Sequence, residues 1–367
     1  MAELLKNRYN HQSIKDLALR IKAIYPLFAV DNFINDIIDK TWDMLGLKAR
    51  MRQIAINLGR YLPTDYEQAL DIIDKIIECY PADFHDFTLM YFPDFIEIYG
   101  QNECDWNLSM AALERFTKSS SSEFAVRQFI INHEKKMMQQ MLSWTKHDNE
   151  HVRRLASEGC RPQLPWGQAL ASFKKNPVPI IDILEQLKED CSLYVRKSVA
   201  NNLNDISKTH PNLVIKIAQD WYGKDSRTDW IVKHGCRTLL KKGNRQVLNI
   251  FGFKNGEYVF VDDFSLNCKS IFIGDAIRFS FKIETKKAIK LRLEYGIDYV
   301  KANGKRNRKI FQICEIFLNK NTKKSYIKKH SFLDRNTRKH YVGIHSITLI
   351  VNGTKRKTLN FELLRVT

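Results

Sequence analysis

Hydrophobic residues recur at spacings of three and four along the first 250 or so positions of the chain. The segments 31–45 and 66–80 show this pattern most plainly, each with isoleucines and leucines between acidic and basic residues. Such spacing places the apolar side chains on one side of a helix. We therefore predict amphipathic α-helices over both segments and a mainly helical N-terminal part.

A short motif repeats within this helical part. Four segments place a valine directly before a basic residue, with the valines 26, 43 and 37 positions apart: Val126-Arg127, Val152-Arg153, Val195-Arg196 and Val232-Lys233. Spacings near 40 residues are typical of HEAT-type helical repeats, which stack into a solenoid. We expect each valine to pack against the next repeat and the basic residues to face outward. The resulting row of cations on the concave face (Arg127, Arg153 or Arg154, Arg196, Lys233) either serves binding or is ordinary solvated charge.

After Gly256 the hydrophobic period changes to two. Six segments alternate apolar and polar residues: 258–261, 271–283, 290–295, 309–318, 345–351 and 359–364. Asn303-Gly304 and Asn352-Gly353 are strong hairpin-turn signals. Six or seven short strands in about 110 residues suggest an immunoglobulin-like β-sandwich. The predicted fold is therefore mainly α: a HEAT-like repeat domain over residues 1–253, followed by a small β-sandwich over residues 257–367.

Charge separates the two parts further. The chain has a formal net charge of +18, and 24 of its 59 basic residues but only 10 of its 41 acidic residues follow Gly256. Lysine-rich clusters in turns, including Lys305, Arg306 and Arg308, suit contact with phosphates. We predict that the sandwich binds a polyanion, with a merely solubilising surface as the alternative. An anionic membrane surface would call for a basic amphipathic helix, which this half does not predict.

Several classes of protein are disfavoured by the sequence. No apolar stretch is long enough to cross a bilayer, and the N-terminus has no apolar secretion core, so we expect a cytoplasmic protein. Seven cysteines without a Cys-x-x-Cys pair argue against a structural metal, and we interpret them as buried apolar side chains. Nucleotide-binding glycine loops and the common hydrolase and metalloprotease motifs are absent from the sequence.

Two carboxylates occupy unfavourable helix positions. Glu158 precedes Gly159 at the end of a helix, where a negative charge faces the negative end of the helix dipole. Asp205 lies late in the next such helix, after several asparagines. Both are candidates for a polar site; the alternatives are an ion pair of Glu158 with Arg154, and capping or exposure of Asp205. Glu123, by contrast, is explained by a favourable helix start and an ion pair with Arg127.

The loop that follows Glu158 is stiffened by two prolines and presents an aromatic residue, Trp166. Such a tryptophan is either a packed lid or a platform on which a nucleic-acid base stacks. Arg161, in the same loop, could hold a phosphate or form a salt bridge with Glu158.

Three long motifs resemble the AlkC branch of the bacterial alkylpurine DNA glycosylases: residues 150–167, 194–211 and 230–239. The resemblance extends over most of residues 1–253, and some members carry a C-terminal immunoglobulin-like domain. It implies monofunctional excision of cationic N3-alkylated bases, 3-methyladenine and 3-methylcytosine, from duplex DNA without base flipping. By motif match, the acidic site residues fall on Glu158, Asp205 and Glu123, and Trp166 and Arg161 border the lesion.

The chemistry that this resemblance implies needs no metal or cofactor. A cationic base is already a good leaving group, so carboxylates need only stabilise the oxocarbenium-like sugar and place a water molecule, leaving an abasic site. We expect a monomer whose partner is double-stranded DNA with alkylated bases and which needs no obligate protein partner. The competing hypothesis is a non-catalytic HEAT-repeat protein that binds damaged or branched nucleic acid.

Overall fold

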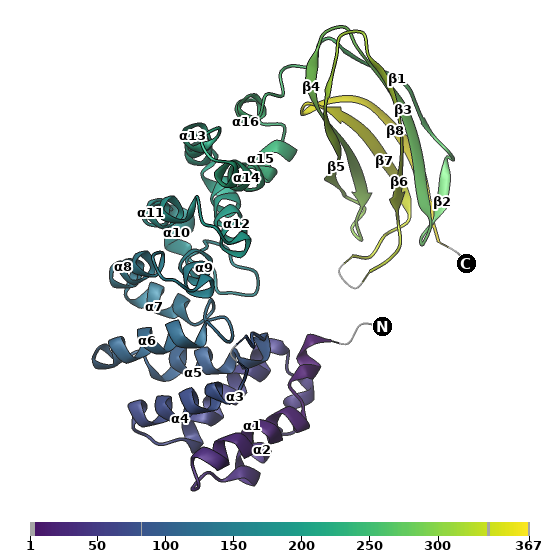
Figure 1. The fold of residues 1–367 in the computed structure, drawn as a ribbon. Coiled ribbons are helices and arrows are strands. Elements are labelled where there is room, and N and C mark those ends of the chain that lie inside the picture. The colour runs from purple at the N-terminus through teal and green to yellow at the C-terminus, as the bar shows by residue number, and fades with distance from the viewer. Residues whose placement is uncertain (1–3, 82, 336–337, 366–367) are drawn as a thin grey trace. The chain divides into compact units, whose positions relative to one another are not determined.

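The computed structural model describes residues 4–81, 83–335 and 338–365. Within these ranges the chain forms 16 α-helices followed by eight β-strands (Figure 1). Contacts between residues divide the chain into two compact units. The first unit comprises Met1–Thr209 and Lys224–Gly235, and the second comprises His210–Gly223 and Cys236–Thr367. The predicted order, a helical-repeat region followed by a β-sandwich, is confirmed, whereas the functional division expected at residues 253–257 stays a prediction.

The first unit is a stack of helices in which two rows can be followed (Figure 1). Its helices are α1 (His11–Ile24), α2 (Val30–Ile37), α3 (Leu47–Tyr61), α4 (Tyr66–Glu78), α5 (Tyr91–Tyr99), α6 (Trp106–Phe116), α7 (Val126–Asn132), α8 (Glu134–Trp144), α9 (Glu150–Gly159), α10 (Ala171–Lys175), α11 (Val178–Leu187), α12 (Leu193–Thr209) and α14 (Ser226–Gly235). One row contains α3, α5, α7, α9, α12 and α14, and α4, α6, α8 and α11 lie in the other. Among the described residues, no helix is both long and apolar enough to span a membrane.

The four valines of the repeated motif are buried in this stack, as predicted. The orientation expected for the first basic residue is wrong. Arg127 is only 1 % exposed, and its guanidinium Nη1 donates to the Gly159 carbonyl oxygen at 2.7 Å. Its Nε donates to the Gln168 carbonyl oxygen at 2.5 Å, so Arg127 joins α7 to the end of α9 and the following loop.

The helix predicted over residues 31–45 is interrupted. The α2 helix ends at Ile37, and a 3₁₀ turn over Trp42–Met44 follows. Between them the Asp39 carboxylate accepts hydrogen bonds from the Thr41 amide at 2.8 Å and from its hydroxyl at 2.6 Å. Such local side-chain bonds compete with helical ones, which explains the break. The helix predicted over residues 66–80 forms as α4, capped by Asp65.

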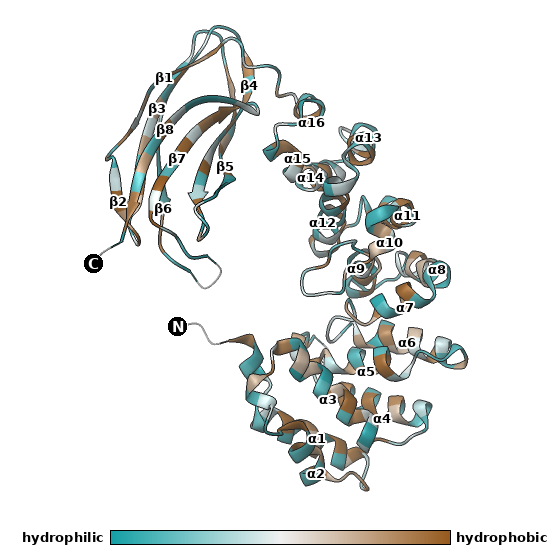
Figure 2. Cartoon of the chain, turned by 180° about the vertical axis from the view of Figure 1, so that it is seen from behind, coloured by the Kyte–Doolittle hydropathy of each residue, from teal (hydrophilic) through white to brown (hydrophobic). Residues whose placement is uncertain are grey.

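The second unit joins three helices to the sandwich. They are α13 (Pro211–Trp221), α15 (Arg237–Lys241) and α16 (Arg245–Ile250), followed by β1 (Val259–Leu266), β2 (Ser270–Phe272), β3 (Ala276–Thr285), β4 (Ile289–Val300), β5 (Arg306–Leu318), β6 (Lys323–Ser331), β7 (Gly343–Val351) and β8 (Thr354–Leu364). One sheet has the order β1-β3-β6 and the other β2-β8-β7-β4-β5. Hydrophobic and hydrophilic residues both occur along the strands (Figure 2), with Phe279, Leu293, Ile347 and others forming the core between the sheets.

The strand prediction missed two features of the sandwich. The single strand expected over residues 271–283 is two strands in different sheets, because Gly274, at φ +108°, lets the chain turn from β2 to β3. The lysine-rich β6 was not predicted, since its polar residues mask the alternation. Both predicted hairpin turns are present, and Asn352 and Gly353 have the two positive φ angles of a type I′ turn.

This last turn packs against the helices of its own unit. A Cβ atom added to Gly243, between α15 and α16, would lie 2.8 Å from the Gly353 carbonyl oxygen. The Asn352 side chain also donates to the Lys254 carbonyl oxygen at 2.8 Å. The backbones of Gly243 and Gly353 therefore meet so closely that no side chain would fit between them. This contact and the Asn352 hydrogen bond hold the β7–β8 turn of the sandwich against α15 and α16.

The interpretation of the cysteines is only partly correct. All seven thiols are free, and Cys160 and Cys236 are buried as expected. Cys79, Cys104 and Cys191 are exposed, which contradicts the expectation of uniform burial.

A buried carboxylate in α5 makes the helical unit sensitive to pH. Asp94 is 2 % exposed and lies 3.0 Å from the Arg52 guanidinium, but its second oxygen has no hydrogen-bond partner among the described residues. Burial raises the pKa of Asp94 to about 7, against the opposing effect of Arg52. Because the folded state binds this proton more tightly than the unfolded chain does, Asp94 lowers stability as pH rises from about 4 to 7.

We expect Asp94→Asn to remove this part of the pH dependence. Relative to the wild type, the variant should gain up to about 4 kcal/mol of unfolding free energy near pH 8 and almost nothing near pH 4, since one pKa unit corresponds to about 1.4 kcal/mol. Urea denaturation at both pH values measures the difference. Asp182→Asn, at an exposed position of α11, is the control; an equal gain in both variants would contradict this account.

Candidate active site

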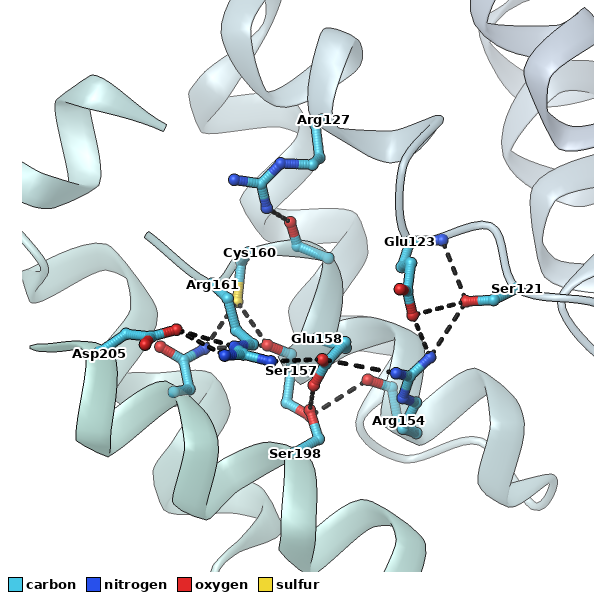
Figure 3. A network of polar contacts seen from close by, with 12 residues as sticks. Ser121, Glu123, Arg127, Arg154, Ser157, Glu158, Cys160, Arg161, Ser198 and Asp205 are labelled. Atoms are coloured by element: carbon cyan, nitrogen blue, oxygen red, sulfur yellow. Dashed lines mark hydrogen bonds and ion pairs between the residues drawn. The ribbon is translucent and has the colours of Figure 1, made fainter. Parts of the chain in front are cut away.

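Glu158, Arg161 and Asp205 form a buried ion-pair network (Figure 3). The Arg161 Nη1 atom donates to Glu158 Oε1 at 2.6 Å, and its Nε atom donates to Asp205 Oδ2 at 2.9 Å. Glu158 lies in the last turn of α9 and Asp205 lies in α12, so the arginine joins the two helices. The predicted Arg161–Glu158 salt bridge is confirmed, while exposure of Asp205 is excluded, because its side chain is buried at 5 % exposure and lies inside α12.

Further donors complete the coordination of both carboxylates. The Ser198 hydroxyl, on α12, donates to Glu158 Oε2 at 2.6 Å, and Ser157 Oγ lies 2.7 Å from Ser198 Oγ. Lys208 donates to Asp205 Oδ1 at 2.8 Å. The expected Glu158–Arg154 pair is also present, at 3.5 Å.

The network keeps its arginines charged despite their burial. Burial by itself would lower the pKa of Arg161, but Glu158 and Asp205 outweigh it, so the pKa is raised. Burial would likewise lower the pKa of Arg154, but the nearby Glu123 and Glu158 carboxylates outweigh it, so this pKa is also raised. The site is therefore a set of fixed charges of both signs in a largely dry environment.

Glu123 belongs to the same network through Arg154 (Figure 3). It lies in the turn before α7, where the Ser121 hydroxyl donates to its carboxylate at 2.8 Å. Its carboxylate also forms a short ion pair with Arg154 Nη1. The predicted pair with Arg127 is wrong, because Glu123 precedes the helix and Arg127 points to the end of α9.

A pocket of about 270 Å³ opens beside this network. Among the described residues, Glu123 lines this pocket together with Arg154, Tyr194 and Trp166, whereas the other two predicted carboxylates, Glu158 and Asp205, do not. Most of the remaining wall is apolar, and Lys48 also lines it, with its ammonium nitrogen 4.4 Å from the Phe124 ring centroid. The pocket thus combines one carboxylate with aromatic walls.

Trp166 stands on a strained loop at the edge of this pocket. Its φ angle is +62°, a left-handed conformation that costs a non-glycine residue about 1 kcal/mol or more. The Lys48 ammonium donates to its carbonyl oxygen at 3.0 Å and so helps to hold it there. Because the side chain is 67 % exposed, Trp166 is not a packed lid, and stacking on a base stays a prediction.

Close helix packing explains why a glycine follows Glu158. Gly159 lies inside α9, and an added Cβ would come within 2.6 Å of the Val126 side chain and 2.9 Å of Met141. The glycine therefore allows α7, α8 and α9 to approach, and it is not needed for a positive φ. Next to it, burial raises the pKa of the Cys160 thiol to about 12, which keeps it neutral.

Two of the cations predicted to line one face form structural hydrogen bonds. Arg153 Nη1 donates to the carbonyl oxygens of His147 and Asp148, and its other nitrogens pair with the Asp190 carboxylate. One repeat later, Arg196 donates to the carbonyl oxygens of Asp190 and Cys191. The arginine of the repeated motif therefore closes the loop that precedes its own helix. Whether Arg153, Arg196 and the half-buried Lys233 also contact DNA stays a prediction.

The sandwich cations differ in their surroundings. Lys305 and Arg306 are exposed at the β4–β5 turn, whereas Arg308 makes two hydrogen bonds to Asp298, at 2.7 and 2.6 Å.

Sequence reasoning missed Lys48, Tyr194 and Ser198. Lys48 meets Trp166 across 118 positions, which no local pattern can reveal. Among the described residues, no three His, Cys, Asp or Glu side chains lie close enough to share a metal ion.

Comparisons with known proteins agree with this arrangement. Residues 33–239 match a family described as "DNA alkylation repair enzyme", and residues 260–365 match the "C-terminal Ig-like domain" of "Uncharacterised protein YhaZ". The chain is 46% identical to the uncharacterized protein YhaZ of Bacillus subtilis (strain 168) over 98% of its own length and 99% of that protein.

A solved structure extends the likeness to three dimensions. The Pseudomonas fluorescens alkylpurine DNA glycosylase AlkC, bound to DNA containing an abasic site analog, superposes with a TM-score of 0.93 at 35% sequence identity. The match covers 98% of this chain and 99% of that one. With its helical repeats, its Ig-like domain and this similarity over nearly the whole length, the chain belongs to the DNA alkylation repair enzyme family and has the AlkC fold.

Proposed function

We propose that this protein is a monofunctional DNA glycosylase that hydrolyses the N-glycosidic bond of cationic N3-alkylated bases in duplex DNA. Its substrates in this proposal are 3-methyladenine and 3-methylcytosine, removed without base flipping, and its product is an abasic site. The observation that carries the proposal is the Glu123 carboxylate, fixed by Arg154 and Ser121 on the wall of an aromatic pocket. The likeness to AlkC, itself bound to DNA with an abasic site analog, supports it.

The electrostatics of the pocket suit this reaction. As the base leaves, the sugar acquires oxocarbenium character, and a fixed carboxylate stabilises that positive charge while orienting a water molecule. A cationic base is also attracted to the faces of aromatic rings such as those of Trp166 and Tyr194. The leaving base becomes neutral, so this attraction helps to bind the damaged base rather than to drive its release.

Within this proposal the three carboxylates have two roles. Glu123 faces the pocket and acts on the sugar and the water. Glu158 and Asp205 are positioning residues, because Arg161 joins them and Glu158 shares Arg154 with Glu123. Arg154 is thereby held between Glu158 and Glu123, and from this position it orients the Glu123 carboxylate.

We expect Glu123→Gln to slow base release strongly while leaving DNA binding nearly intact. Loss of one preorganised charge should lower the rate by about 10²–10³. Chromatography of bases freed from methylated duplex DNA measures release, and anisotropy with undamaged duplex measures binding. Glu67→Gln, an exposed residue of α4, is the matched control. Normal base release by Glu123→Gln would contradict the assignment, and absence of release by the wild type despite DNA binding would favour the non-catalytic alternative.

Glu158→Gln should act differently, because it removes charge from a buried network. Arg161 would keep only Asp205 as a charged partner, and breaking a buried pair costs about 3 to 5 kcal/mol. Urea denaturation should show a loss of this size for Glu158→Gln and a smaller loss for Glu123→Gln, because the Glu123–Arg154 pair is less deeply buried than the Glu158–Arg161 pair. Equal stability of the two variants would disprove the division into catalytic and positioning carboxylates.

The salt dependence of DNA binding should separate the sandwich cations. Each lost phosphate contact lowers the slope of log K against log salt by about 0.9. We therefore expect a shallower slope in Lys305→Gln and Arg306→Gln. Arg308→Gln should instead mainly reduce stability, because Arg308 pairs with Asp298. Anisotropy titrations between about 50 and 200 mM salt test this; unchanged slopes in all three variants would exclude phosphate contacts here.

A further inference from the structure

The β-sandwich has a pocket of its own, of about 430 Å³. Its wall comes from the end of β4, the turn into β5, the start of β5, and residues 338–341 before β7. None of these residues belongs to the Glu123 site. A pocket of this volume is in the range that small-molecule ligands occupy.

Four cations line this pocket without a compensating acid. They are Lys301, Lys309, Arg338 and Lys339, and the described lining includes no aspartate or glutamate. The neighbouring acids in the described part of the sandwich are engaged elsewhere, Asp298 with Arg308 and Asp334 with His340. Burial lowers the pKa of Lys309, and the charges of Arg338 and Lys301 lower it further. The cations are thus close enough to repel one another, a repulsion that a bound anion would relieve.

Buried groups position one of these cations. Arg338 Nη1 lies 3.3 Å from the Tyr299 hydroxyl, and its guanidinium carbon lies 5.3 Å from the centroid of that ring. The Tyr299 hydroxyl is in turn 2.6 Å from His330 Nε2, in the core of the sandwich. Arg338 therefore has a fixed support, unlike a lysine on an open surface.

The pocket also presents groups that a bare anion would not need. Tyr341, 37 % exposed, offers an aromatic ring beside the cations, and Asn303 and Asn307 offer amides. An aromatic face next to clustered cations suits a nucleotide, which joins a phosphate to a sugar and a flat base.

We propose that this pocket binds one nucleotide unit of a DNA strand, with its phosphate held by Lys301, Lys309 and Arg338 and its base or sugar against Tyr341. As a contact to DNA the inference rests on the function proposed above. As a nucleotide-phosphate site it does not, because a free nucleotide carries the same chemistry.

Calorimetric titration of the full chain tests the site with three probes: thymidine 5′-monophosphate, thymidine and inorganic phosphate. We expect the nucleotide to bind, thymidine not to bind, and the double variant Lys301→Gln/Lys309→Gln to weaken nucleotide binding about tenfold, a change of about 1.4 kcal/mol. The control Lys320→Gln/Lys324→Gln removes the same charge from exposed lysines outside the pocket. Equal weakening in both double variants, or equal binding of thymidine and its phosphate, would overturn the proposal.

Two further measurements identify the ligand and its source. Tyr341→Ala should weaken the nucleotide but not inorganic phosphate; an equal effect on both would overturn the role of the ring. With a short undamaged duplex, the pocket double variant should lose more affinity than its control. Equal duplex affinity with lost nucleotide binding would overturn the DNA contact and leave a free nucleotide as the ligand. Neither nucleotide binding nor binding of the undamaged duplex requires base release. Failure of the proposed glycosylase activity would therefore appear only in the chromatography of freed bases, and not in these binding measurements.

Discussion

The buried ion pairs of Arg161 are the interaction on which the candidate active site depends. Glu158 and Asp205 project from two helices into a largely dry space, where carboxylates cannot remain charged without a partner. Arg161 pairs with both, and Arg154 extends the chain of charges to Glu123. The α9–α12 contact, the loop after α9 and the orientation of the pocket carboxylate therefore depend on one connected set of charges.

Sequence patterns reveal the secondary structure of this protein better than its site. Hydrophobic periodicity is local, so it correctly indicated the helical repeats and most strands, and the two Asn-Gly pairs correctly indicated both hairpin turns. Glu158 and Asp205 stood out because each was unfavourable in its own helix. Their common partner could not be foreseen, since Arg161 and Asp205 are 44 positions apart and meet only after the helices stack.

Glu123, in contrast, is a candidate site residue that local sequence patterns did not mark at all. Its local surroundings, a serine-rich turn and a nearby arginine, explain a carboxylate completely, so only the family resemblance marked it. Its significance comes from the pocket wall, which is assembled from Lys48, Trp166 and Tyr194 in distant segments. Arg127 was misjudged for a related reason: a basic residue beside a buried valine was expected to face outward, whereas Arg127 is buried and donates to the Gly159 carbonyl oxygen across the helix stack.

The contact between Gly243 and Gly353 has a consequence for where the chain can be divided. The sequence changes its hydrophobic period near residue 256, yet Lys290, Asn352 and Arg356 donate to the carbonyl oxygens of Phe251, Lys254 and Gly256, respectively. A fragment that began at the first strand would leave these donors without acceptors and expose the surface that α15 and α16 cover. The smallest autonomous folding module is therefore not the sandwich alone: it begins among the last helices.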